Sequence, residues 1–225
     1  MGEYYHWVNI DKKEYITPRD FDYGNKFHES MNKDSAPLHA LHVLLANEWK
    51  GDRVLWLGDE RLVSEDFPNA VIQNIYVQTA EFGDSGYTLN LILDTYRNVS
   101  CLFKEAEEDV REEIGYYIEE YLELGRLEPY NEYGIDLEHP YEGLFLKTGR
   151  RYKYTINHTK KVYYSLDETK ILFQDNTEDD FSDPLPILMG YGRVTEPGEW
   201  LGDIIGVSDS MPEGYLLLKK LYMDR

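Results

Sequence analysis

The chain has 225 residues, 42% of them hydrophobic and 29% charged, with a formal net charge of −20. That composition is typical of a globular protein, and so acidic a surface repels nucleic acid and anionic membranes. The single cysteine, Cys101, excludes an internal disulfide, and no apolar run approaches the ~18 residues that span a bilayer. The first residues lack a basic start followed by an apolar stretch, so no leader peptide is expected. A cytoplasmic location is therefore expected.

The first quarter of the chain predicts two strands, a helix and a third strand. Residues 4–10 and 14–16 are rich in aromatic and β-branched side chains and should form a hairpin. A further short strand is expected at 26–30. Residues 37–49 carry leucines at helical spacing after Ser35, a suitable N-cap, and residues 54–57 should form a short buried strand.

Residues 66–127 have no counterpart later in the chain and indicate an all-helical insertion. Helices are expected at 68–80, 89–96 and 100–124, the last with one apolar face and one glutamate-rich face. The pattern then returns to strands, at 144–147, 151–157, 161–166 and 170–174, which predicts a meander. A short helix should follow at 184–189, and the type of the final segment, 215–222, stays open.

Two motifs occur twice and predict an internal duplication. E-W-x-G-D begins at Glu48 and again at Glu199, and an asparagine followed by a lysine pair lies upstream of each copy. The separation from Asn9 to Trp49 is 40 positions, and that from Asn157 to Trp200 is 43. Ordered motifs at similar spacing indicate a repeated unit of hairpin, helix and strand.

The predicted fold class is therefore α+β, with two related halves packed around a pseudo-twofold axis and the helical insertion between them. The expected segments are 1–65 for the first repeat, 66–142 for the acidic insertion and 143–225 for the β-rich second repeat. A unit of about 55 residues buries too little surface to be stable alone, so one compact domain is expected.

Carboxylates at matching places in the two copies are the candidate catalytic residues, because paired carboxylates can divide acid and base roles or share a metal. These are Asp52, Asp203, Asp59 and Asp209. The alternative, which we favour, is that each aspartate bonds backbone donors in its turn. The paired lysines could hold an anion between the halves, or could only keep strand edges soluble. The candidate ligand-binding residues are Lys12, Lys13, Lys160, Lys161 and Arg193.

His39 and His42 stand three residues apart on the expected helix, a spacing that can place two imidazoles on one ion. His42, however, falls among leucines, where a buried structural histidine is the commoner explanation, and no metal-binding motif supports a site. No metal and no cofactor are therefore expected.

The acidic side chains are concentrated in two segments. Residues 101–138 hold 13 acidic and 3 basic side chains, and residues 175–183 hold five acidic side chains and no basic one. Such surfaces either serve only solubility or bind a basic protein, and the 20 tyrosines favour an interface. The candidate partner-binding residues are Glu112, Glu113, Glu119, Glu120, Asp179 and Asp180.

Residues 7–16, W-V-N-I-D-K-K-E-Y-I, with 49–54, W-K-G-D-R-V, resemble a group of bacterial and phage proteins that have no assigned activity. The resemblance covers the first repeat only and implies a bacterial or phage origin. The sequence thus predicts a non-enzymatic protein of the immunity or anti-defence type that binds a basic partner. The alternative is a small-ligand binder or metal-assisted hydrolase with its site at the seam between the repeats.

Overall fold

The structure is a computed structural model that describes residues 2–59, 93, 95–147, 149–192 and 197–223. It is a mixed α+β fold with three sheets and few helices. The strands are β1 (Tyr5–Asn9), β2 (Glu14–Ile16), β3 (Val54–Gly58), β4 (Arg97–Asn98), β5 (Tyr154–Asn157), β6 (Val162–Tyr164), β7 (Lys170–Phe173), β8 (Gly190–Tyr191), β9 (Ile205–Ser208), β10 (Leu216–Leu217) and β11 (Lys220–Met223). The α-helices are α1 (Ala36–Ala46), α4 (Glu107–Leu124) and α5 (Leu185–Met189). The described residues also form the 3-10 turns η1 (Pro18–Phe21), η2 (Glu29–Met31), η3 (Ser100–Leu102) and η4 (Lys104–Ala106).

The two larger sheets share one arrangement around their central strands. The first has the order β4-β2-β1-β3-β8 and the second β10-β6-β5-β9. In each, the central strand pairs antiparallel with the strand after it and with the strand after the tryptophan motif, and an outer strand adds in parallel. The local arrangement is therefore repeated, whereas descent by duplication and a twofold axis relating whole halves stay predictions.

The tryptophan motif folds alike in both copies. Trp49 and Trp200 are both buried in the largest core cluster, and the glycine two positions later has φ of 85° at Gly51 and 84° at Gly202. Glycine is required there because other residues rarely adopt this left-handed conformation. The turn then closes through the aspartate N–H, which donates to the tryptophan carbonyl at 3.1 Å in the first copy and 3.0 Å in the second.

One core joins the three segments that the sequence separates. Its buried side chains come from the first strands, from α1, from the start of α4 and from the second half, as with Trp7, Phe103, Val110, Tyr164 and Trp200. Helix α1 packs on β9 of the second half, whereas α5 packs on β3 of the first. Each half therefore depends on the other for its burial.

Several expected elements differ from those observed. In place of the short strand expected at 26–30, Lys26 forms an isolated bridge with Tyr4, and a turn then leads into η2. The helix expected from residue 100 begins only at Glu107. The insertion is not all-helical among its described residues, because β4 lies in it and pairs with β2. Strand β7 leaves the expected meander and pairs in parallel with β11. The helices expected at 68–80 and 89–96 lie outside the described residues, apart from three positions in the second range, Leu93 within a helix and Thr95 and Tyr96 outside one.

Candidate functional site

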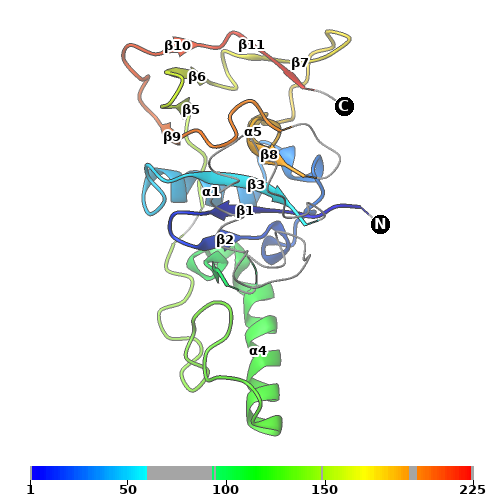
Figure 1. The fold of residues 1–225 in the computed structure, drawn as a ribbon, viewed down its shortest axis with the longest axis vertical. Coiled ribbons are helices and arrows are strands. Elements are labelled where there is room, and N and C mark those ends of the chain that lie inside the picture. The colour runs from blue at the N-terminus through cyan, green and yellow to red at the C-terminus, as the bar shows by residue number, and fades with distance from the viewer. Residues whose placement is uncertain (1, 60–92, 94, 148, 193–196, 224–225) are drawn as a thin grey trace, which may run out of the picture.

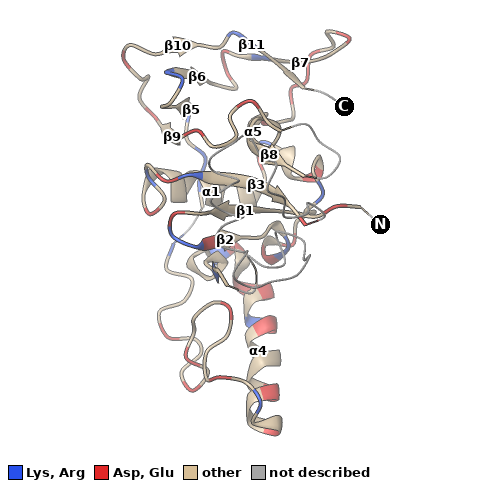
Figure 2. Ribbon diagram, viewed as in Figure 1, with Lys and Arg blue, Asp and Glu red and all other residues tan. Residues whose placement is uncertain are grey.

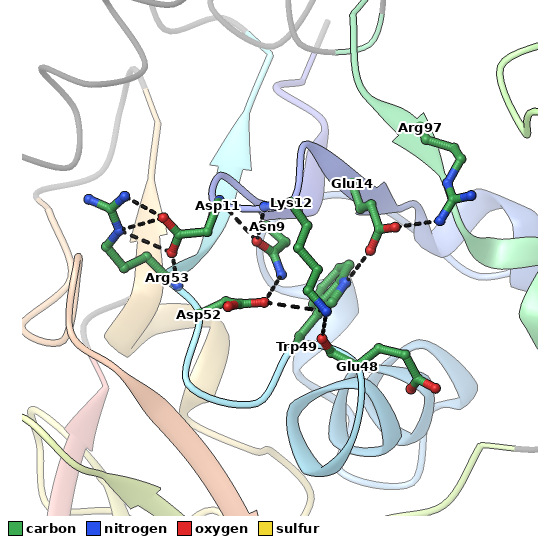
Figure 3. A network of polar contacts seen from close by, with 9 residues as sticks. All are labelled: Asn9, Asp11, Lys12, Glu14, Glu48, Trp49, Asp52, Arg53 and Arg97. Atoms are coloured by element: carbon green, nitrogen blue, oxygen red, sulfur yellow. Dashed lines mark hydrogen bonds and ion pairs between the residues drawn. The ribbon is translucent and has the colours of Figure 1, made fainter.

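The first repeated motif forms a polar clamp that ties the hairpin turn to the turn after α1 (Figure 3). The buried Asn9 side chain donates from Nδ2 to Asp52 Oδ2 at 2.9 Å, while its Oδ1 accepts the N–H of Lys12 at 3.0 Å. The Lys12 ammonium contacts the carbonyl oxygen of Glu48 and lies 3.9 Å from Asp52. Asp52 is thus occupied by structural partners.

The second motif forms the same clamp. Asn157, also fully buried, donates from Nδ2 to Asp203 Oδ2 at 2.7 Å and accepts the N–H of Lys160 at 2.8 Å. Lys160 Nζ lies 3.0 Å from Asp203 and contacts the carbonyl oxygen of Glu199. Asp52, Asp203, Lys12 and Lys160 therefore all contact structural partners in these turns, and a catalytic or ligand-binding role for them stays a prediction.

The other paired aspartates close the ends of strands. Asp59 Oδ1 accepts the N–H of Tyr4 at 2.9 Å, beside the start of β1. Asp209 forms an ion pair with Arg150 at 2.7 Å and accepts the N–H of Lys153 at 3.4 Å, beside the start of β5. These carboxylates thus serve the same structural purpose in the two sheets.

The two clamps lie side by side, because Arg53 and Ile204, which follow the two aspartates, form an antiparallel bridge. Lys13 and Lys161 are both exposed, with φ of 55° and 56°, and extend the matched geometry of the two hairpin turns. Arg193 lies outside the described residues. The bridge joins the two halves here through their backbones.

His42 lies in the core, and its Nδ1 accepts the N–H of Tyr152 at 3.0 Å, so the proton resides on Nε2. Burial lowers the pKa of His42 to about 3. His39 is half-buried, and desolvation lowers its pKa as well. With Nδ1 of His42 already accepting a backbone proton, the two imidazoles do not form a prepared metal site.

The acidic face of α4 is the distinctive surface of the described molecule. The helix is attached by Val110 and Ile114, which are buried, and its far end extends beyond the sheets (Figures 1 and 2). Glu112 and Glu119 are exposed, whereas Glu113 and Glu120 are partly covered. We call α4 and the following residues 125–146 the acidic arm.

A carboxylate in the last turn of α4 opposes the helix dipole. Negative charge stabilises a helix N-terminus and destabilises its C-terminus by typically ~0.3–1 kcal/mol per charge. Glu123 lies in the last turn, which holds no basic residue to offset it, whereas Glu119 and Glu120 lie just before that turn. The helix dipole therefore does not explain Glu123, and it neither favours nor strongly opposes the other two glutamates.

The acidic arm also exposes large apolar side chains, which sequence analysis did not single out. Leu122 is 73% exposed, and Tyr116 is 62% exposed. Other exposed large apolar side chains of the arm are Leu124, Tyr130, Tyr141 and Leu146. The signal available in the sequence was that Leu122 and Leu124 fall off the apolar face of the helix. Acidic side chains interspersed with tyrosine and leucine give a surface that can bury apolar area as well as attract cations.

A buried acidic cluster lies where the arm meets the body. Asp20 is 8% exposed and accepts the Nδ2–H of Asn98 at 2.8 Å. Burial, with further repulsion from Glu132 and Glu113, raises the pKa of Asp20 to about 6. Burial also raises the pKa of Glu132, whose carboxylate accepts the Tyr15 hydroxyl.

The second acidic segment, 175–183, lies near the opposite end of the molecule from α4 (Figure 1). Asp179 accepts the N–H of Phe181 at 2.7 Å and the N–H and hydroxyl of Ser182, so it shapes its own loop. Asp183 is buried and accepts the Tyr164 hydroxyl. Asp180 is exposed. One compact partner surface cannot readily contact both acidic segments.

The chain matches no protein-family model, and no curated protein or solved structure is significantly similar to it. The resemblance of the first repeat to bacterial and phage proteins accordingly stays a prediction. Among the described residues, no helix is both long and apolar enough to cross a membrane.

Proposed function

We propose that this protein is a non-enzymatic interaction or inhibitor protein whose acidic arm binds a basic surface on another protein. The observation that carries the proposal is the group formed by Glu119, Glu120 and Glu123 at the protruding end of α4, whose last turn holds no basic residue to offset Glu123. Acidic side chains on a protruding element beside exposed leucine and tyrosine are suited to a basic partner. A bacterial or phage setting and an immunity or anti-defence role are part of this proposal.

The experiment compares two triple variants of equal charge. Glu119→Gln, Glu120→Gln and Glu123→Gln neutralise the arm, whereas Asp34→Asn, Asp167→Asn and Glu213→Gln neutralise three exposed acids outside both acidic segments. Both are used to capture proteins from a bacterial lysate at low and high salt, and each captured basic protein is then purified and titrated by calorimetry. The arm variant should bind roughly ten-fold more weakly, from three charge pairs of ~0.2–1 kcal/mol each, and the control should bind like wild type.

A partner whose affinity is equal for the two variants, or does not fall as salt rises, contradicts the proposal, because a charge-driven interface must be screened. A dependence on Asp52 or Asp203 without a dependence on the arm favours the alternative function at the seam.

A further inference from the structure

A mainly apolar cleft of about 900 Å³ separates the N-terminal residues from the C-terminal strand. This volume falls within the range of sites that hold ligands. Apolar side chains from both halves line it: Phe27, Ile187, Leu188, Leu218, Leu221 and Tyr222. None of the residues in the two clamps contributes to it except Glu199, whose carbonyl oxygen contacts Lys160.

One wall of the cleft is the edge of β11. Three consecutive residues, Lys220, Leu221 and Tyr222, line it. Because successive side chains of a strand point to opposite faces, a cleft bordered by three in a row faces the edge of the strand.

The backbone of that edge is unpaired among the described residues. Strand β11 pairs only with β7, and the N–H of Lys170 donates to the Lys219 carbonyl oxygen at 3.0 Å. In a parallel ladder alternate residues face the partner strand, so the backbone groups of Lys220 and Tyr222 point away from β7. A two-stranded sheet with a free edge accepts a third strand readily.

Side chains of both signs line the cleft, the carboxylates of Glu3, Glu29 and Glu199 and the ammonium groups of Lys26 and Lys220. The carboxylates of Glu3 and Glu29 accept the Tyr5 hydroxyl at 2.7 Å and the N–H of Lys26 at 3.1 Å. The ammonium groups of Lys26 and Lys220, in contrast, have no carboxylate partner in the part of the chain that the structure describes. Two unpaired cations beside apolar walls complement a segment that combines apolar side chains with a carboxylate.

We propose that the cleft binds an extended peptide that adds to the free edge of β11, places alternate apolar side chains against Phe27 and Ile187, and presents an acidic group to Lys26 and Lys220. Main-chain hydrogen bonds would supply affinity, and the apolar walls would select the sequence. This site is independent of the acidic arm, whose partner is basic.

The test selects random octapeptides displayed on phage against the full-length protein. Binding of the selected peptides is compared between wild type, Lys220→Glu, and the neighbouring control Lys219→Glu, which does not line the cleft. We expect peptides with alternating apolar residues and at least one acid. Their affinity should fall about five-fold or more in Lys220→Glu and less than two-fold in the control. Neutralising the arm should leave their affinity unchanged, so the two proposals fail separately.

The best peptide is then synthesised in two versions, or phases. One carries N-methyl groups on its odd-numbered amides and the other on its even-numbered amides. One phase blocks the hydrogen bonds to β11 and should weaken binding at least ten-fold, whereas the other should be tolerated. Equal effects of the two phases, or selected peptides indifferent to Lys220→Glu, overturn the proposal. Saturable binding of dodecanoate that displaces a peptide insensitive to methylation would instead identify a site for amphipathic anions.

Discussion

At the residue scale, each polar clamp is built around a buried asparagine, rather than around the aspartate that the sequence analysis singled out. Asn9 and Asn157 are each fully buried and each join a hairpin turn to a tryptophan turn. An amide is suited to this position because its oxygen accepts turn N–H groups while its nitrogen donates to a carboxylate. A carboxylate at the same place could not donate.

We therefore expect Asn9→Ala and Asn157→Ala to lower the free energy of unfolding by similar amounts, about 1–3 kcal/mol each, because each leaves buried donors and acceptors unsatisfied. Urea denaturation measures this, with Lys13→Ala and Lys161→Ala as exposed controls that should change little. A large loss in one copy and none in the other would show that the two clamps differ in importance.

The raised pKa of Asp20 gives a pH-dependent prediction. Because its pKa in the folded state is about 6, above its ordinary value near 3.8, the folded state binds this proton first as pH falls. The unfavourable contribution of the charged carboxylate is thus complete above about pH 6 and is lost below about pH 4.

Asp20→Asn should accordingly be more stable than wild type at pH 7–8, by roughly 1–3 kcal/mol, and lose that advantage near pH 4. Urea denaturation of both proteins across this range measures the difference. His42 acts with opposite sign, since its lowered pKa costs stability as pH falls below 6.5, but it is present in both proteins and cancels. A constant difference at all pH values would contradict the assignment.

At the element scale, α4 should show a conflict between stability and binding. Replacing Glu119, Glu120 and Glu123 by glutamine removes one charge, that of Glu123, from the unfavourable last turn of the helix and two from just before it. The triple variant should gain about 0.3–1 kcal/mol in stability, mainly from Glu123, while losing partner affinity.

Glu108→Gln, in the first turn, is the matched control and should slightly destabilise the protein, because a negative charge there is favourable. Thermal denaturation of the two variants at low ionic strength measures both signs. If the triple variant were less stable than wild type, the glutamates would have a structural role that the helix dipole does not describe.

The elements predictable from sequence are those set by local pattern. The first hairpin, α1 and β3 follow from aromatic alternation, leucine spacing and a glycine turn, and each lies within a few residues of its expected bounds. Ser35 does occupy the N-cap of α1, yet its hydroxyl makes no capping hydrogen bond. The parallel pairings of β3 with β8 and of β7 with β11 could not be predicted, because they join distant segments and leave no periodic signal.

The candidate site was predictable only as a charge pattern. The sequence shows that residues 101–138 are acidic, but not that the arm extends from the body. Its repeated aspartates suggested chemistry, whereas the structure engages them with Asn9, Asn157 and neighbouring lysines. Such pairing depends on which turns meet in space.

At the scale of the whole molecule, the shared core predicts a single cooperative unfolding transition. The four tryptophans, Trp7, Trp49, Trp56 and Trp200, come from both halves and lie in one cluster. Tryptophan fluorescence and far-ultraviolet circular dichroism should therefore give the same denaturation midpoint. Two separated transitions would show that the halves fold independently.

The acidic arm is attached to the body at both ends. After α4 the chain returns to bury Tyr133, Ile135 and Leu137 in the main core, and Arg111 on the helix stacks over the ring of Tyr141 at 4.4 Å. A protein bound to the end of the arm would thus have a fixed orientation relative to the sheets. The body of this molecule would then always cover the same part of the partner. A catalytic groove in that part of the partner would be blocked.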